Sequence, residues 1–229
     1  MRLLLIDHGC CDLPDTRVHH WRRELETLGV RAFACGPSTV SHLKEQHAGL
    51  HGIHLHDIAA ASGALLKAVQ SGEPQALLNA IATVSPRLLG LIRETARQMV
   101  AEAVDTHGPD VIFVLHAGIL TDLAIETGIP VAVHVSLTDL AAAGSKQSMR
   151  DFITASIGSC NAIVAADAAT AELLEQKWLS VDSQALAAAH SRIEVWPLEH
   201  GCAAAILSLC HRILNRRREA GHGFFASRE

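Results

Sequence analysis

Two histidines each follow an apolar segment that is typical of a buried strand. The segment Arg2–Ile6 ends at Asp7, His8 and Gly9, and residues 111–115 end at His116. An imidazole changes its charge near neutral pH, so it can take a proton from a hydroxyl group and later return it. We therefore treat His8 and His116 as candidate catalytic residues.

A short polar run follows a third apolar segment, Val131–Val135. It contains Ser136, Thr138 and Asp139, and the last two could simply cap a following helix. A hydrolase triad of Ser136, His116 and Asp139 is disfavoured because no G-x-S-x-G turn surrounds the serine. Asp139 is instead a third candidate catalytic residue, beside the two histidines.

The pattern of apolar segments predicts the fold. The three segments are nearly continuous in aliphatic residues, which is typical of strands covered by helices on both faces and therefore of a parallel sheet. Further strands are expected at 30–35, 53–56, 162–166 and 193–196, and helices at 18–28, 39–47, 58–70, 74–106 with a break at Pro86, 145–159, 168–178 and 202–218. The class is α/β, a Rossmann-like three-layer sandwich with a mainly parallel sheet of about six or seven strands. Because the carboxyl ends of parallel strands meet at one edge, we expect the candidate residues to gather there.

Length and composition limit the number of domains, the kinds of partner and the cellular location that can be expected. The chain has 229 residues, of which 49% are hydrophobic, enough for one domain spanning residues 1–229 with 202–218 as a terminal helix packing back on it. A net charge of −5 gives no reason to expect a nucleic-acid partner. Six cysteines without a C-x-x-C pair favour a cytoplasmic location, and no segment is apolar enough for a signal peptide or a transmembrane helix.

Cofactor-binding motifs are missing from the sequence. The loop after the first strand has Gly9 but no G-x-G-x-x-G, and Gly144-Ser145-Lys146 lacks the upstream glycine of a phosphate-binding P-loop. We therefore expect no cofactor.

A cluster of histidines keeps one metal hypothesis open. His51, His54 and His56 lie within six positions, and residues at alternate positions of a strand face the same way. Such a set could hold zinc or nickel in a small metalloenzyme. With fifteen histidines in the chain, chance clustering explains the pattern as well, so no metal is the main expectation.

The central sequence resembles a known family. PDVIFVLHAG, LAIETGIPVAVHVSLTDL, MRDFITASIGSCNAIVAADAATAELL and IEVWPLEHG match, in order and spacing, the N-terminal acceptor-side domain of glycosyltransferase family 4, whose members have the two-domain GT-B fold. Where that family has His-Gly before Thr-Asp-Leu, this chain has Ser136-Leu137, so the role of the family's histidine cannot be transferred. After Pro197 the family continues into a donor domain that binds the nucleotide-sugar, whereas this chain enters its last helix.

The resemblance implies a function in glycosyl transfer. The chain would bind a sugar acceptor or a nucleotide-sugar as one half of a transfer site, and a separate donor-domain subunit or a second copy would complete it. A non-catalytic partner subunit is the alternative. Besides the candidate catalytic residues, the residues expected to bind substrate are Gly9, Arg17, Gly118, Ser136, Thr138 and Glu199.

Overall fold

The protein is described from a computed structural model, which places residues 1–9, 16–38, 49–55, 58, 62–144, 147–178, 193–196 and 202–223. Within these residues, seven strands form one sheet in the order β3-β2-β1-β4-β5-β6-β7, and all neighbouring strands are parallel. The strands are β1 (Arg2–Ile6), β2 (Arg31–Ser38), β3 (Leu50–His54), β4 (Val111–Val114), β5 (Val131–Val135), β6 (Ala162–Ala165) and β7 (Ile193–Val195). The predicted α/β class with a parallel sheet is confirmed.

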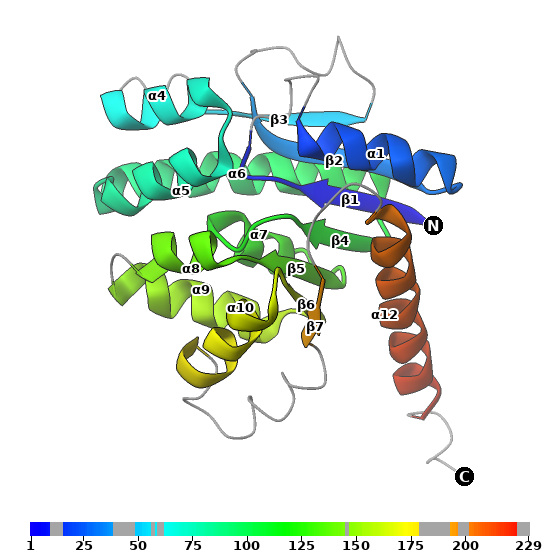
Figure 1. Ribbon diagram of the computed structural model, residues 1–229. Coiled ribbons are helices and arrows are strands. Elements are labelled where there is room, and N and C mark those ends of the chain that lie inside the picture. Colours follow the sequence, from blue (N-terminus) through cyan, green and yellow to red (C-terminus); the bar gives the residue numbers. More distant parts are fainter. Residues whose placement is uncertain are drawn as a thin grey trace.

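Helices cover both faces of the sheet (Figure 1). Side chains of α1 and α12 pack on one face, against Leu3, Leu5 and Phe113, and the other helices pack on the opposite face, against Leu4, Ile6 and Val114. The helices are α1 (Arg17–Thr27), α4 (Gly63–Ser71), α5 (Pro74–Thr83), α6 (Pro86–His107), α7 (Ile119–Glu126), α8 (Leu137–Gly144), α9 (Gln147–Ser159), α10 (Ala168–Leu173) with a π-helical turn (Leu174–Trp178), and α12 (Ala203–Gly223). Alternate residues of each strand therefore enter different apolar layers, which explains the continuous apolar runs.

The strand order reverses between β1 and β4. The chain adds β2 and β3 on one side of β1, then crosses through α4, α5 and α6 to place β4 on the other side. Leu3 to Ile6 pair in register with Val111 to Val114, and β4 pairs in turn with β5. In an open parallel sheet, the loops that diverge at such a reversal leave a crevice at the carboxyl ends of the strands.

Several boundaries differ from those predicted. β3 begins at Leu50, three residues before the predicted start, because it pairs with the extended end of β2. Pro37 is tolerated in β2 because that end pairs with β3 only, while the pairing of β1 with β2 ends at Ile6 and Cys35. Within the helix predicted at 58–70, Ile58 is helical, residues 59–61 lie outside the described residues, and α4 begins at Gly63, where the Ser62 Oγ accepts the Leu65 N–H.

The remaining predicted helices agree with the structure at Pro86 and differ from it around residue 145 and at the end of α12. The break at Pro86 is confirmed, since α5 ends at Thr83 and α6 begins with Pro86 after the Ser85 cap. An extra helix, α8, precedes the one predicted at 145–159, and α12 extends beyond its predicted end. The predicted helix at 39–47 lies outside the described residues. None of the described helices combines the length and apolar composition that a bilayer crossing requires.

Burial in the central strands should dominate the stability of this fold. We expect Leu5→Ala, in β1 and fully buried, to lower the free energy of unfolding by about 2–5 kcal/mol because it leaves a cavity between the sheet and α1. Leu91→Ala removes the same atoms from a side chain that is 52% exposed, and should change it by less than about 0.5 kcal/mol. Urea denaturation of both variants measures the difference, and equal losses would contradict the layered core.

Candidate functional site

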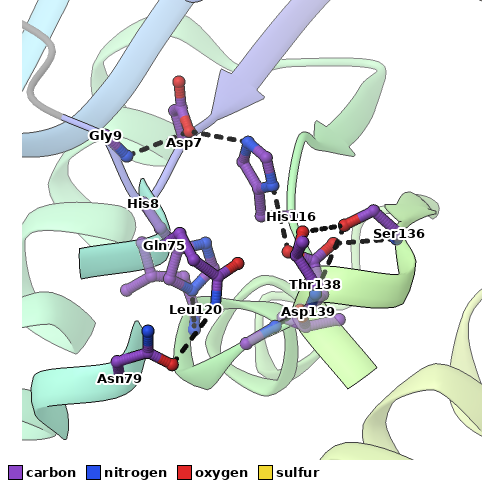
Figure 2. A network of polar contacts seen from close by, with 12 residues as sticks. Asp7, His8, Gly9, Gln75, Asn79, His116, Leu120, Ser136, Thr138 and Asp139 are labelled. Atoms are coloured by element: carbon purple, nitrogen blue, oxygen red, sulfur yellow. Dashed lines mark hydrogen bonds and ion pairs between the residues drawn. The ribbon is translucent and has the colours of Figure 1, made fainter. Parts of the chain in front are cut away.

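The candidate site lies at the carboxyl ends of β1, β4 and β5 (Figure 2). The imidazole of His116 sits between two carboxylates, with Nδ1 3.2 Å from Asp139 Oδ1 and Nε2 3.8 Å from Asp7 Oδ1. Asp7 and Asp139 are buried, whereas 14% of the His116 side chain is exposed. The imidazole is thus the member of this group that a ligand can reach.

A reciprocal cap holds Asp139 in place at the start of α8. The Ser136 N–H donates to Asp139 Oδ2 at 2.9 Å, and the Asp139 N–H donates to Ser136 Oγ at 3.3 Å. The Ser136 hydroxyl also shares a hydrogen bond of 2.8 Å with the Thr138 hydroxyl. Helix capping and a place in the site are therefore compatible, because one carboxylate oxygen serves the cap and the other faces His116.

The two members of the His116–Asp139 pair favour each other's charged form. Burial opposes a charge on His116, but the hydrogen bond and charge of Asp139, with a smaller contribution from Asp7, outweigh it and raise its pKa. Burial likewise opposes the charge on Asp139, but His116 and the Ser136 bonds outweigh it and lower its pKa. Because an ionised carboxylate only accepts hydrogen bonds, Nδ1 carries a proton toward Asp139, and Nε2 lies 3.8 Å from Asp7 Oδ1.

His8 is close to this pair but its environment is different. Its ring is buried, and Nε2 accepts the Leu120 N–H at 3.3 Å, so the proton of the neutral ring is on Nδ1. Burial, assisted by the charge of His116, lowers the pKa of His8 to about 3. His8 is therefore neutral at ordinary pH, and its hydrogen bond ties the end of β1 to the start of α7.

Gly118 makes this contact possible. A Cβ on Gly118 would overlap the His8 ring and would lie 2.6 Å from Leu78 Cδ2 of α5. The close approach of the α7 start to the His8 ring therefore requires a residue without a side chain.

Other predicted substrate-binding residues are placed less directly. Arg17 is the exposed first residue of α1, and its charge opposes protonation of His116, so it lies within electrostatic reach of the site. The Gly9 N–H donates to Asp7 Oδ1 at 3.0 Å and the Gly118 N–H donates to Thr121 Oγ1 at 3.1 Å, so both amides already have partners. Glu199 lies outside the described residues.

Two polar residues at this edge were not identified from the sequence. From the sequence, Asp7 is expected only to begin the loop after the first strand. His134, the fourth residue of β5, is buried with neither ring nitrogen hydrogen-bonded to a described residue. Burial lowers the pKa of His134 to about 4, against the opposing charge of Asp139. A lone histidine within an otherwise aliphatic strand was the available indication.

In the histidine cluster of the metal hypothesis, His51 contacts a histidine from outside the cluster. His51 in β3 lies with its Nε2 2.6 Å from the Nε2 of His107 in α6, and His107 stacks on Phe33 at 3.8 Å between ring centroids. The His54 side chain and His56 lie outside the described residues. Across the part of the chain that is described, no three His, Cys, Asp or Glu residues are grouped to hold a metal ion.

Comparisons with known proteins relate this fold to glycosyltransferases of the GT-B type. A chain titled as residues 27–220 and 406–426 of sucrose-phosphate synthase from Thermosynechococcus elongatus aligns over 93% of this chain and 97% of its own, with a TM-score of 0.56 and 9% identity. SsfS6, a glycosyltransferase from Streptomyces sp. SF2575, aligns over 72% of this chain and 50% of its own, with a TM-score of 0.41 and 15% identity. No family model and no curated protein sequence matched. The likeness at these identities concerns the fold.

A methyl group at residue 118 tests the close packing of the site. We expect Gly118→Ala to lower the free energy of unfolding by about 1–3 kcal/mol, because the added Cβ must push His8 or Leu78 aside. Gly90→Ala is the matched control: it lies in α6, has no atom near its Cβ position, and should stabilise the helix by up to about 1 kcal/mol. Thermal or urea unfolding of both variants gives the answer, and a neutral Gly118→Ala would contradict the described contact.

The buried histidines should also make stability depend on pH. The unfolded chain protonates His8 and His134 near pH 6.5, whereas their pKa values in the folded chain are about 3 and 4. The unfolded state therefore binds more protons as the pH falls from about 6.5 to 4, and the free energy of unfolding decreases. His116 has the opposite sign, since its raised pKa favours the folded state at low pH and this gain is lost as the pH rises through the folded value.

As the pH falls through this range, we expect the free energy of unfolding of His134→Gln to decrease less than that of the parent. The variant lacks one of the two histidines whose pKa is lowered by folding. Urea denaturation at a series of pH values measures the slope. His211→Gln, at an exposed position of α12, is the control and should keep the parent slope. An unchanged slope in the His134 variant would show that His134 is protonated in the folded protein.

Proposed function

We propose that this chain binds a sugar or nucleotide-sugar at the carboxyl edge of its sheet and supplies one half of a glycosyl-transfer site. The observation that supports this most is the reachable imidazole of His116, held by Asp139 beside Asp7 where the strand order reverses. The GT-B-like fold is consistent with it, although fold alone does not assign a reaction.

In this proposal His116 is the general base for an acceptor hydroxyl. Asp139 accepts the Nδ1–H and fixes the ring, so that Nε2 takes the hydroxyl proton while the oxygen bonds to the sugar carbon and the leaving group departs. The imidazolium that forms is stabilised by Asp139 and Asp7. The raised pKa of His116 reflects the carboxylates of Asp139 and Asp7, which would stabilise the imidazolium that forms when the ring takes the proton. His8 would act by positioning the start of α7.

Further polar groups around His116 suit the hydroxyls of a sugar. Ser136 and Thr138 present hydroxyl groups from the start of α8 (Figure 2). α5 approaches the same edge, and its Gln75 Nε2 donates to Asn79 Oδ1 at 3.2 Å. Arg17 would face the anionic part of a phosphorylated ligand, a role that the engaged amides of Gly9 and Gly118 cannot fill without losing their present bonds.

The second half of the site would come from another polypeptide or a second copy of this chain. Enzymes that transfer sugars between two domains need both halves to orient the reactants and exclude water. The sucrose-phosphate synthase chain, which aligns over 97% of its length, shares this fold, and the two-part site is proposed from the resemblance to the GT-B family.

A non-catalytic partner subunit is the second candidate function. Among the described residues, Leu137 and Val195 are exposed by 43% and 51%, and both lie where strands of this edge end. Exposed apolar side chains at the crevice would suit contact with a donor domain. In that case the chain binds the domain without binding sugar.

Ligand binding tests the proposal. Thermal-shift and calorimetric titrations with UDP-glucose, GDP-mannose and ADP-glucose, and with sugar phosphates, should identify a stabilising ligand, since saturation at a hundred times the dissociation constant adds about 2.7 kcal/mol. We expect His116→Gln to reduce binding, and to reduce turnover by about 10²–10⁴-fold wherever transfer is measured with the completing domain. His211→Gln should be unaffected, and circular dichroism checks that both variants fold. Equal activity of the His116 variant and its control would refute the assigned base.

A further inference from the structure

A second hollow lies at the opposite edge of the sheet, where β5 and β6 begin. Its volume is about 510 Å³, and its walls come from the end of α7, the starts of β5 and β6, and the last turns of α12. Its lining includes Val131, the first residue of β5, Asn161, just before β6, and Arg216 and Arg217 of α12. It shares no residue with the candidate site around His116.

The two arginines lack counter-charges. Neither Arg216 nor Arg217 forms an ion pair or hydrogen bond with a residue that the structure describes, and no acidic residue lines the hollow. Arg212, one turn earlier on the same helix, is paired with both carboxylate oxygens of Glu194 at 2.5 and 2.7 Å. Glu126, at the nearby end of α7, is already held by Arg97 at 2.8 Å. Two exposed guanidinium-bearing residues therefore line this hollow without an ion pair to any residue that the structure describes.

Asn161 adds a fixed donor to the lining of the hollow. Its Oδ1 accepts the Val131 N–H at 2.9 Å and its N–H donates to the Val131 carbonyl at 2.8 Å. These bonds fix the side chain and leave the amide NH₂ without a partner among the described residues. Among the described lining residues, the side-chain donors without a described acceptor are thus the two guanidinium groups and this amide, since the Ser159 hydroxyl donates to the Ala155 carbonyl.

The remaining walls are mostly apolar, apart from Ser159, whose hydroxyl donates to the Ala155 carbonyl at 2.9 Å. Ile125, Ile129, Pro130 and Ile213 line the hollow together with Val131. A volume of this size is typical of small-molecule sites, in which apolar walls carry most of the contact and a few polar groups fix orientation. Arginine is well suited to carboxylate and phosphate groups because its planar donors can bind two oxygens at once.

We infer that this hollow binds a small anionic ligand, a phosphate or carboxylate group joined to an apolar part, with Arg216 and Arg217 holding the anion and the isoleucine-rich wall holding the apolar part. The carbonyl ends of α7 and α9 face the same edge and slightly disfavour an anion. Binding therefore depends on both arginines. A membrane surface is the competing partner, but no exposed large hydrophobic residue of the described chain lines the hollow to enter a bilayer.

Phenyl phosphate and benzoate test the inference as probes on the full chain, with phenol as the uncharged comparison. Isothermal titration should show saturable binding of the two anions and none of phenol, with NMR shifts at Asn161 and Ile129. The double variant Arg216→Gln/Arg217→Gln should weaken binding roughly tenfold or more, since it removes both charged donors of the site. Arg23→Gln/Arg87→Gln removes two exposed arginines elsewhere, with the same change in net charge, and should bind as the parent does.

Three results would overturn the inference. The first is no saturable binding of either anion at millimolar concentration. The second is equal weakening in the two double variants, which would mean that only net charge matters. The third is binding to vesicles containing phosphatidylserine without binding of phenyl phosphate, which would assign the arginines to a membrane surface. None of these outcomes depends on the proposed glycosyl-transfer site, because the probes and variants leave His116 untouched.

Discussion

The parallel pairing of β1, β4 and β5 is the constraint on which the candidate site depends. Asp7 lies more than a hundred positions before His116, and Asp139 lies 23 positions after it, yet each follows the end of one of these strands. The strand register also contributes, because Ile6 lies beside Val114 and Val114 beside Val133. The three strands therefore end at nearly the same level of the sheet. Antiparallel pairing of either neighbour would send its polar end to the opposite edge of the sheet.

Burial then gives three neighbouring histidines different properties. His8 and His134 are enclosed without an adjacent carboxylate strong enough to offset desolvation, and their pKa values fall. His116 is nearly as enclosed, but its hydrogen bond to Asp139 and the charge of that carboxylate raise its pKa instead of lowering it. One edge of the sheet thus holds two neutral imidazoles that support the structure and one that can exchange a proton. The paired His116 is the group around which a function at this edge can be argued.

Much of the fold could be predicted from the sequence because the strands are short, apolar and bounded by polar residues. Val131–Val135 and Arg2–Ile6 have the predicted limits. β3 was displaced because its position is set by pairing with Gly36 to Ser38 of β2, and such distant pairing leaves no local pattern. The structure brings His8, His116 and Asp139 together, as expected from strand ends.

The remaining polar residues of the edge could not be found in this way. His134 lies inside an apolar strand, and its proximity to Asp139 depends on the face toward which a strand residue points. Asp7 has a place in the site only because β4 lies next to β1 and brings His116 within 3.8 Å. His51 was grouped with its sequence neighbours, but its partner is His107, 56 positions away. Each of these contacts is set by tertiary packing.

The central claim is that His116, paired with Asp139, is the proton-exchanging group at the ligand edge. A titration of ¹⁵N-labelled histidine rings by NMR, with and without the nucleotide-sugar or sugar phosphate that stabilises the protein, tests it most directly. We expect the pKa of His116 to lie above the ordinary histidine value of 6.5, His8 to stay neutral to about pH 3, and the ligand to shift the Nε2 resonance of His116. A His116 that titrates below His8, or that does not respond to the ligand, would contradict it.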